Sequence, residues 1–298
     1  MRTVLIATDF SERAKRAEIR AAMLCIEHEC STVELMTVKE ASQPDILAQI
    51  LHSTAAAAQA SIAEQATREL ASRSASLKDH HGIQCSSVVR FGQPAVEIVS
   101  RAEAIGADLV LIGARGGNFF SNLLLGSTAD KLTHLCTRPL LIVKNEPKQL
   151  YRHVLVPVDF SEDSKRAAEF ALEVAPKADV TFLHAFEVWF EGQMQYAGVS
   201  RELIDDYRLK AREEARLKLN QFVTGLNAEE RYLNRVVTFG IPGPVVREYA
   251  KQMQPDLIVM GKHGRSRFAE LIIGSVTRDT IDQTDADLLV VPASVGPA

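Results

Sequence analysis

Short apolar runs alternate with longer amphipathic stretches along the whole chain. The runs are rich in β-branched residues and apolar throughout, as at residues 4–7 and 154–158, and Ala-rich or charged stretches with helical spacing follow them. Strands of this kind are typical of a parallel sheet that helices cover on both faces. With right-handed crossover connections, the pattern predicts a doubly wound α/β fold.

Ten strands are expected, in two sets of five. The sets are residues 4–7, 33–38, 88–90, 109–112 and 140–143, and residues 154–158, 180–185, 236–238, 257–260 and 288–291. Long helices are expected at about 45–78 and about 202–219. Ser11 and Ser161 directly follow the first strand of each set and are suited to cap a helix. The proline of each Phe-Gly-x-Pro, Pro94 or Pro242, suits the first turn of another.

The second half of the chain repeats the first. Residues 2–17 read RTVLIATDFSERAKRA and residues 152–167 read RHVLVPVDFSEDSKRA, while RFGQPAVEI from Arg90 matches TFGIPGPVV from Thr238. A period near 150 residues is a whole domain, and the length of 298 residues favours two domains. The repeat predicts tandem domains at 1–146 and 151–298, with a polar linker around Pro147.

Charge and composition argue against a nucleic-acid-binding protein, a membrane-spanning protein and a disulfide-stabilised protein. A net charge of −4 and a pI near 6.1 lack the basic footprint of a nucleic-acid binder. No apolar run approaches the roughly 18–20 residues that a membrane span needs, and the N-terminus lacks a signal-peptide pattern, so a cytoplasmic location is expected. The cysteines have no paired short spacing, which favours buried or reduced thiols over a disulfide or zinc framework: Cys25, Cys30, Cys85 and Cys136.

A glycine loop follows the fourth strand of each half. The first half has Gly113-x-x-Gly116, nine residues, then Gly126-Ser127, and the second repeats this spacing from Gly261 to Ser275. Glycines let backbone amides approach an anion and adopt positive φ, and the following helix offers free N–H groups to a phosphate. The alternative is a pair of tight turns at a strand–helix junction. No P-loop and no Gly-x-Gly-x-x-Gly after the first strand occurs.

With its Asp-Phe-Ser, its Phe-Gly-x-Pro and above all its Gly-x-x-Gly-(nine)-Gly-Ser, the chain resembles a tandem-domain member of the universal stress protein family over nearly all its length. The resemblance implies two Rossmann-like, adenine nucleotide α hydrolase-like domains. It also implies that the strand-one Asp and a residue just after strand two lie at the adenine and ribose, and that the glycine loop and Ser hold the phosphates. The implied positions are Asp9, Val38, Gly113, Gly116, Gly126, Ser127 and Thr128, and Asp159, Ala185, Gly261, Gly264, Gly274, Ser275 and Val276.

The two loops differ in charge. Lys262, His263, Arg265 and Arg267 surround the second, whereas Arg115 is the one cation of the first. Cationic side chains are good partners for a triphosphate, so the second half is predicted to bind ATP more tightly. The alternative is that these side chains are simply solvated.

The expected function is a stress-response protein that binds ATP or a related adenine nucleotide, with or without Mg, as a nucleotide-linked switch. No catalytic residue and no metal site is assigned. One alternative is a slow Mg-dependent ATPase in the same pocket, and another is a scaffold that acts through protein or small-ligand contacts. The two domains are expected to pack as an intramolecular pseudo-dimer through their final strands, and the chain could dimerise again.

Overall fold

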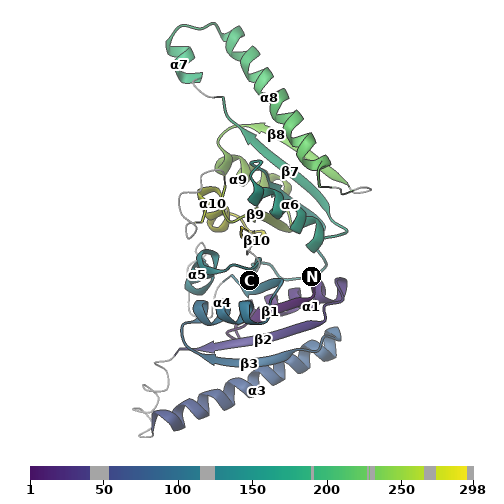
Figure 1. Ribbon diagram of the computed structural model, residues 1–298, viewed down its shortest axis with the longest axis vertical. Helices are drawn as coiled ribbons and strands as arrows, with labels where there is room; N and C mark the ends of the chain where they lie inside the picture. The colour runs from purple at the N-terminus through teal and green to yellow at the C-terminus, as the bar shows by residue number, and fades with distance from the viewer. Residues whose placement is uncertain are drawn as a thin grey trace. The chain divides into compact units, whose positions relative to one another are not determined.

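The computed structural model describes residues 1–40, 54–114, 125–188, 191–226, 228, 232–264 and 273–293. Strands and helices alternate as the apolar pattern predicts (Figure 1). The elements of the first repeat are β1 (Thr3–Ala7), α1 (Glu12–Glu27), β2 (Thr32–Lys39), α3 (Ala55–His81), β3 (Ser86–Phe91), α4 (Pro94–Ala104), β4 (Leu109–Gly113), α5 (Ser127–Leu135) and β5 (Leu140–Val143).

The second repeat follows the same order, and a short helix, α7, precedes its long helix α8. Its elements are β6 (His153–Pro157), α6 (Glu162–Val174), β7 (Asp179–Phe186), α7 (Glu191–Tyr196), α8 (Arg201–Thr224), β8 (Leu233–Phe239), α9 (Pro242–Met253), β9 (Leu257–Gly261), α10 (Ser275–Gln283) and β10 (Asp287–Val291).

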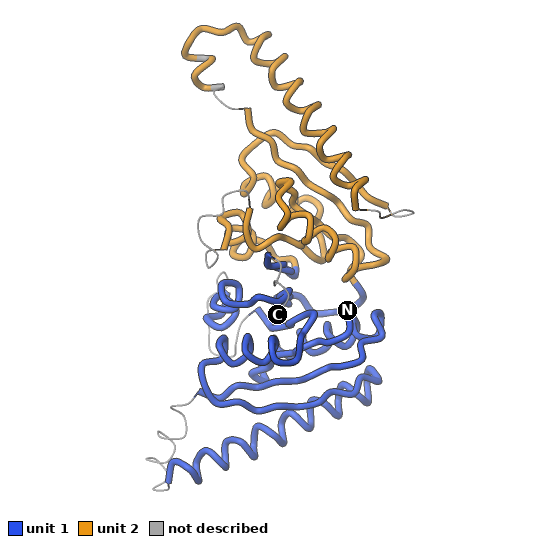
Figure 2. Tube along the Cα trace, in the orientation of Figure 1, with its two compact units in different colours: residues 1–150, 287–298 blue, residues 151–286 orange. Residues whose placement is uncertain are grey.

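The chain divides into two compact units, residues 1–150 with 287–298, and residues 151–286 (Figure 2). Strand β10 is grouped with the first unit because it pairs antiparallel with β5, with Leu289 opposite Leu141. The limits 1–146 and 151–298 remain a prediction. None of the described helices combines the length and apolar character that a membrane crossing requires.

The sheet of unit 1 has the order β3-β2-β1-β4-β5-β10, and its first five strands are parallel. Helices α1 and α3 cover one face, and α4 and α5 cover the other. Because the chain runs outward from β1 in both directions, the strand order reverses between β1 and β4. Ligands of doubly wound sheets bind at the carboxyl ends of the strands at this point.

Unit 2 repeats the arrangement with the parallel order β9-β6-β7-β8. Helices α6 and α8 lie on one face, and α9 and α10 pack together on the other. The reversal of strand order falls between β6 and β9. The predicted doubly wound α/β fold is therefore confirmed, and it occurs twice.

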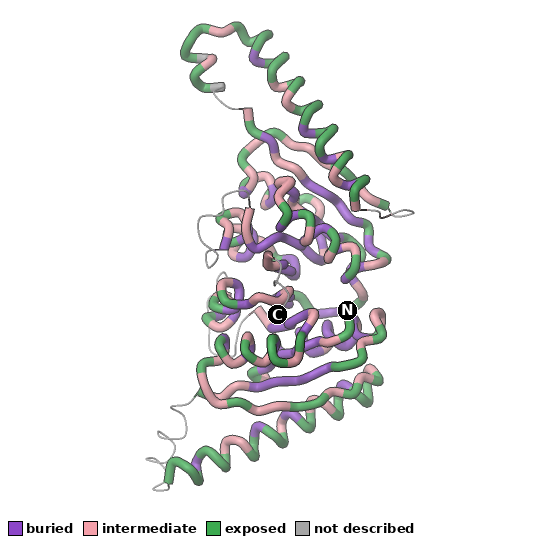
Figure 3. Tube along the Cα trace, in the orientation of Figure 1, coloured by how far each residue is buried: buried purple, intermediate pink, exposed green. Residues whose placement is uncertain are grey.

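The central strands form the core because they are covered on both faces (Figure 3). Val4, Leu5 and Ile6 of β1 are fully buried, as are Val154, Leu155 and Val156 of β6. A continuous run of apolar residues therefore exposes no apolar side chain to solvent here. This explains why apolar and polar residues do not alternate along these strands.

Helix starts match the sequence. Ser11 caps α1 by accepting a hydrogen bond from the Ala14 amide at 3.2 Å. Ser161 does the same for α6. Pro94 and Pro242 each occupy the first helical position. These four predictions are confirmed.

Element ends differ from the expected limits. Helix α3 begins at Ala55 after the cap Thr54, and residues 45–53 of the expected helix lie outside the described residues. Strand β8 extends the expected 236–238 in both directions because its ladder with β7 continues through the exposed Asn234 and Arg235. Backbone pairing does not require apolar side chains, so the apolar run underestimates the strand.

Candidate functional site

The turn after the first strand of each unit has the same unusual backbone. Phe10 and Phe160 adopt left-handed conformations, with φ of 67° and 65°. A non-glycine residue pays about 1–2 kcal/mol for this conformation. Asp9 and Asp159 precede these phenylalanines and lie at the carboxyl edge of the sheet. Strain of this kind is retained where the surrounding structure requires it, which marks both turns as candidate sites.

Asp159 and Asp9 are each held by the serine that caps the following helix. The Asp159 Oδ1 atom accepts hydrogen bonds from the Ser161 amide at 2.9 Å and from the Ser161 hydroxyl at 2.6 Å. Asp9 Oδ1 accepts from the Ser11 amide at 3.0 Å. In both units one carboxylate oxygen is thus engaged by the turn itself, and the helix cap and the carboxylate are fixed together.

A buried polar network supports the turn in unit 1. Glu18 of α1 is only 2% exposed, and it accepts a hydrogen bond from the Thr8 hydroxyl at 2.6 Å. Arg73 of α3 lies 3.5 Å from the other carboxylate oxygen and donates to the Phe10 carbonyl at 2.7 Å. Burial raises the pKa of the Glu18 carboxyl, although the Thr8 hydrogen bond and the Arg73 charge oppose the shift.

In unit 2, aromatic side chains support the equivalent turn at Phe160. Phe160 packs against His184 at a centroid distance of 4.3 Å and against Phe222 at 6.0 Å. His184 Nδ1 lies 2.7 Å from the Val158 carbonyl oxygen. The two repeats therefore hold one backbone geometry by different chemistry, and the candidate sites are not copies of each other.

Gly113 and Gly261, the first glycines of the two loops, are required by close packing. A Cβ atom on Gly113 would lie 2.8 Å from the carbonyl carbon and oxygen of Arg13, and one on Gly261 would lie 2.9 Å from the Asp163 carbonyl carbon. Strand and helix backbones meet at these points, so no side chain fits.

The expectation of positive φ in the loops is wrong for the described glycines. Gly126 and Gly274 have φ of −64° and −59°, and the other described loop glycines also lie outside the left-handed region: Gly113, Gly261 and Gly264. Steric crowding, and not backbone handedness, is the physical reason for glycine at Gly113 and Gly261.

In unit 2 the glycine loop meets the strand-one carboxylate. A Cβ atom on Gly264 would lie 2.9 Å from Asp159 Oδ2, so the loop backbone passes directly over the carboxylate. The Gly274 amide donates to the Lys262 carbonyl at 2.9 Å and closes the base of the loop. In unit 1 the Gly126 amide makes the same closure with the Ala114 carbonyl at 3.0 Å.

Helices α5 and α10 begin at these closures and have no side-chain cap. Their N-caps are Gly126 and Gly274, which make no side-chain hydrogen bond, whereas α1 and α6 are capped by serine hydroxyls. The first-turn N–H groups of a helix need partners from outside the helix. The positions from Ser127 and Ser275 onward therefore suit an anion such as phosphate.

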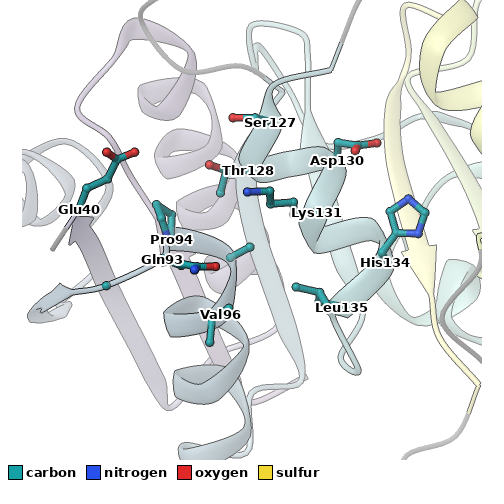
Figure 4. A pocket seen from close by; sticks show the side chains of 12 residues that line it. Glu40, Gln93, Pro94, Val96, Ser127, Thr128, Asp130, Lys131, His134 and Leu135 are labelled. Atoms are coloured by element: carbon teal, nitrogen blue, oxygen red, sulfur yellow. The ribbon is translucent and has the colours of Figure 1, made fainter. Parts of the chain in front are cut away.

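A cavity of about 720 Å³ opens beside this position in unit 1, between the starts of α4 and α5 (Figure 4). Thr128 and Lys131 lie on the side of α5 toward Gln93 and Pro94. The lining residues are Glu40, Gly92, Gln93, Pro94, Ala95, Val96, Ser127, Thr128, Asp130, Lys131, His134 and Leu135. Two predicted residues, Ser127 and Thr128, line it, whereas Asp9 and Gly113 are not among the lining residues.

Sequence reasoning did not include Glu40, Gln93, Lys131 or His134. The sequence could have indicated Gln93, because Gly92-x-Pro94 follows the third strand and the carboxyl ends of parallel strands lie at one edge of the sheet. Lys131 follows Thr128 by three residues on α5, a helical spacing that would have placed it on the same side as Thr128.

Val38 and Ala185, expected just after strand two, lie within the strands. The ladders continue one residue further, to Lys39 opposite Phe91 and to Phe186 opposite Phe239. Val38 packs against the core of unit 1, where its side chain is half-buried. Both residues remain at the carboxyl edge as the penultimate residue of the strand.

The described cations of the second loop are turned inward. Lys262 is 6% exposed, and the His263 side chain is 12% exposed with Nδ1 3.5 Å from Asp163 Oδ2. Asp163 also accepts from Arg166 at 3.0 Å. The remaining predicted residues of the two loops lie outside the described residues: Arg115, Gly116, Arg265 and Arg267.

Two doubly wound domains, each with a glycine loop between its fourth strand and an uncapped helix, define a tandem α/β protein. The model of the Universal stress protein family matches residues 1–144 and 150–292. The chain therefore belongs to this family and contains its domain twice.

Similar proteins agree with this assignment. A universal stress protein of Mycobacterium tuberculosis is 28% identical over 277 residues, which cover 89% of this chain and 81% of that protein. One of Methanocaldococcus jannaschii is 27% identical over 154 residues, covering 48% of this chain and 95% of that protein. The solved structure of a universal stress protein from Archaeoglobus fulgidus covers 97% of this chain and 98% of its own, with a TM-score of 0.67 and 22% identity, a likeness of fold.

Proposed function

We propose that this chain is a cytoplasmic protein that binds an adenine nucleotide, ATP with or without Mg, at the carboxyl edge of each unit and acts as a nucleotide-linked switch. The observation that carries the proposal is the position of Gly264 over Asp159 Oδ2. It joins a carboxylate, which can accept hydrogen bonds from ribose hydroxyls, to a loop that leads directly into an uncapped helix.

Each part of the site has a separate role. The first-turn amides of α5 and α10 and the hydroxyls of Ser127 and Ser275 would donate to phosphate oxygens. Asp9 and Asp159 would hold the nucleoside end, and Val38 and Ala185 would contact the base from the strand ends. Ordering of the glycine loops around the phosphates would then be the change that a partner senses.

The proposal includes tighter binding of the nucleotide by unit 2 than by unit 1, but Lys262 and His263 no longer support it. Lys262 and His263 are largely buried, so the charge argument rests on Arg265 and Arg267. The hydrogen bonds to Asp159 support the site in unit 2, because two donors from Ser161 fix the orientation of the carboxylate.

Calorimetric titration of the full chain, stripped of ligand, with Mg-ATP tests the proposal. We expect one or two equivalents to bind, with Mg-CTP as a matched triphosphate that lacks the purine and binds more weakly. No binding to a folded sample would overturn the nucleotide proposal and favour the scaffold. Phosphate release in the same samples should stay at background for a switch, and steady release would identify a slow ATPase.

A further inference from the structure

Two cysteines of unit 1 lie in contact where α1 turns toward β2. Cys25 is in the last turn of α1, and the chain reverses through Glu29, which has a φ of 50°. The Cys30 amide then donates to the Cys25 carbonyl at 3.0 Å, a helix-end hydrogen bond that brings the side chains of these two positions together. The pairing depends on the tight reversal of the backbone, and the sequence spacing alone did not reveal it.

The two thiols differ in exposure and acidity. Cys25 is 1% exposed, whereas Cys30 is half-buried and reaches solvent. The neighbouring Cys25 thiol lowers the pKa of Cys30, and the Cys30 thiol, together with burial, raises the pKa of Cys25. The thiolate is the nucleophilic form of cysteine, so Cys30 is the thiol suited to attack. Cys25 is its neighbour and is therefore the thiol in position to resolve the oxidised Cys30.

The other two cysteines lack this arrangement. Burial raises the pKa of Cys85 to about 11. Cys136 is buried in the apolar cluster under α4 and α5. The second repeat builds the same fold without any cysteine, so the thiol pair is not a requirement of the fold.

We propose that Cys25 and Cys30 form a redox-active dithiol that a hydroperoxide converts to an intramolecular disulfide. The Cys30 thiolate attacks the terminal peroxide oxygen, the O–O bond breaks, and the other oxygen leaves as an alkoxide, or as hydroxide when the oxidant is hydrogen peroxide. Cys30 is thereby converted to a sulfenic acid. The Cys25 sulfur then attacks the Cys30 sulfur and loses its proton, and the sulfenic oxygen leaves as water. One peroxide is reduced for each dithiol oxidised. The two sulfur atoms would lie about 2 Å apart in the disulfide.

The dithiol lies away from the proposed nucleotide site. Cys30 precedes β2 and is therefore at the amino edge of the sheet, whereas the glycine loop and Asp9 lie at the carboxyl edge. Oxidation would tie the end of α1 to the turn that leads into β2. The disulfide closes a short loop, so the expected physical effect is a higher Tm of the oxidised protein.

The test treats the reduced full-length protein with hydrogen peroxide, blocks free thiols with N-ethylmaleimide and maps the peptides by mass spectrometry. We expect a Cys25–Cys30 disulfide with the loss of two hydrogen atoms, formed at least about tenfold faster than any oxidation of Cys136, whose thiol is buried. Cys85→Ser should leave the reaction unchanged. Cys25→Ser should leave a sulfenic acid at Cys30 that dimedone traps.

The wild-type peptide map does not depend on the folding of any variant. A disulfide that involves Cys85, oxidation of Cys136 as fast as that of Cys30, or oxidation of Cys30 without a disulfide would each overturn the proposal. Cys30→Ser serves as the complementary variant, and we expect it to lose at least about tenfold in the rate at which peroxide consumes the remaining thiols.

Discussion

Gly264 lies against Asp159, so close that a methyl group on the glycine would come within 2.9 Å of the carboxylate oxygen. The side chain that follows the first strand of unit 2 and the loop that follows its fourth strand therefore form one surface. A ligand that contacts one of them must also approach the other.

Gly264→Ala tests this contact. The added Cβ would displace Asp159 or the loop, and we expect the affinity of unit 2 for Mg-ATP to fall at least about tenfold, or about 1.4 kcal/mol. Gly192→Ala is the matched control, because nothing lies within 4 Å of its Cβ position. Equal calorimetric affinities for the two variants would show that Asp159 is not part of a nucleotide site.

Ser161→Ala separates the helix cap from the site. Loss of the cap should lower the free energy of unfolding by about 1 kcal/mol, and loss of the hydroxyl donor to Asp159 should also weaken nucleotide binding. Ser200 caps α8 in the same way, with the Leu203 amide 3.4 Å away. Ser200→Ala should show a similar loss of stability in urea unfolding and normal binding. A binding defect in both variants would point to a general effect on the fold.

Gly113→Ala and Gly261→Ala are expected to destabilise the protein by about 1–3 kcal/mol, the usual cost of forcing extra atoms into a packed contact. The obstacle in each case is helix backbone, which cannot rotate away. Thermal unfolding without nucleotide is the measurement, and Gly192→Ala, in a helix where alanine is favoured over glycine, should leave Tm unchanged or raise it. An unchanged Tm in both loop variants would contradict the close-packing argument.

Glu18 should make stability depend on pH. Its folded pKa is raised above the ordinary value of 4.5, so the folded state holds this proton more tightly than the unfolded state. The stabilisation is fully present below 4.5 and is lost as the pH rises through the raised folded value. Measured between acidic and neutral pH, the free energy of unfolding of the wild type relative to Glu18→Gln should decline. A relative stability that increases with pH would mean that Arg73 dominates over burial.

The fold could be predicted from the sequence because its signals are local. Apolar runs mark the strands, Ser11 and Ser161 mark the helix starts, and Pro94 marks a first turn. The repeat then places two equivalent domains. Strand limits were less accurate at β8, where ladder pairing continues through polar residues.

The site could be predicted only in outline. Asp9, Asp159 and the glycine loops were found by motif, but the reason for Gly113 is a contact with Arg13, which is distant in sequence. The contacts of Glu18 with Arg73 and of Cys25 with Cys30 depend on how helix α3 packs and how the chain reverses at Glu29. No local pattern encodes such contacts, since either partner alone reads as an ordinary surface or core residue.

Because Gly113 and Gly261 are required by close packing, these two glycines of the family's loop motif are not evidence that a ligand binds. These glycines separate a strand from a helix whether or not a ligand is present. A descendant that had abandoned its ligand would still be under selection to keep them. The presence of Gly113 and Gly261 in a sequence therefore indicates an intact fold. Gly264 and the glycine N-caps of α5 and α10 are the positions that indicate a functional ligand site.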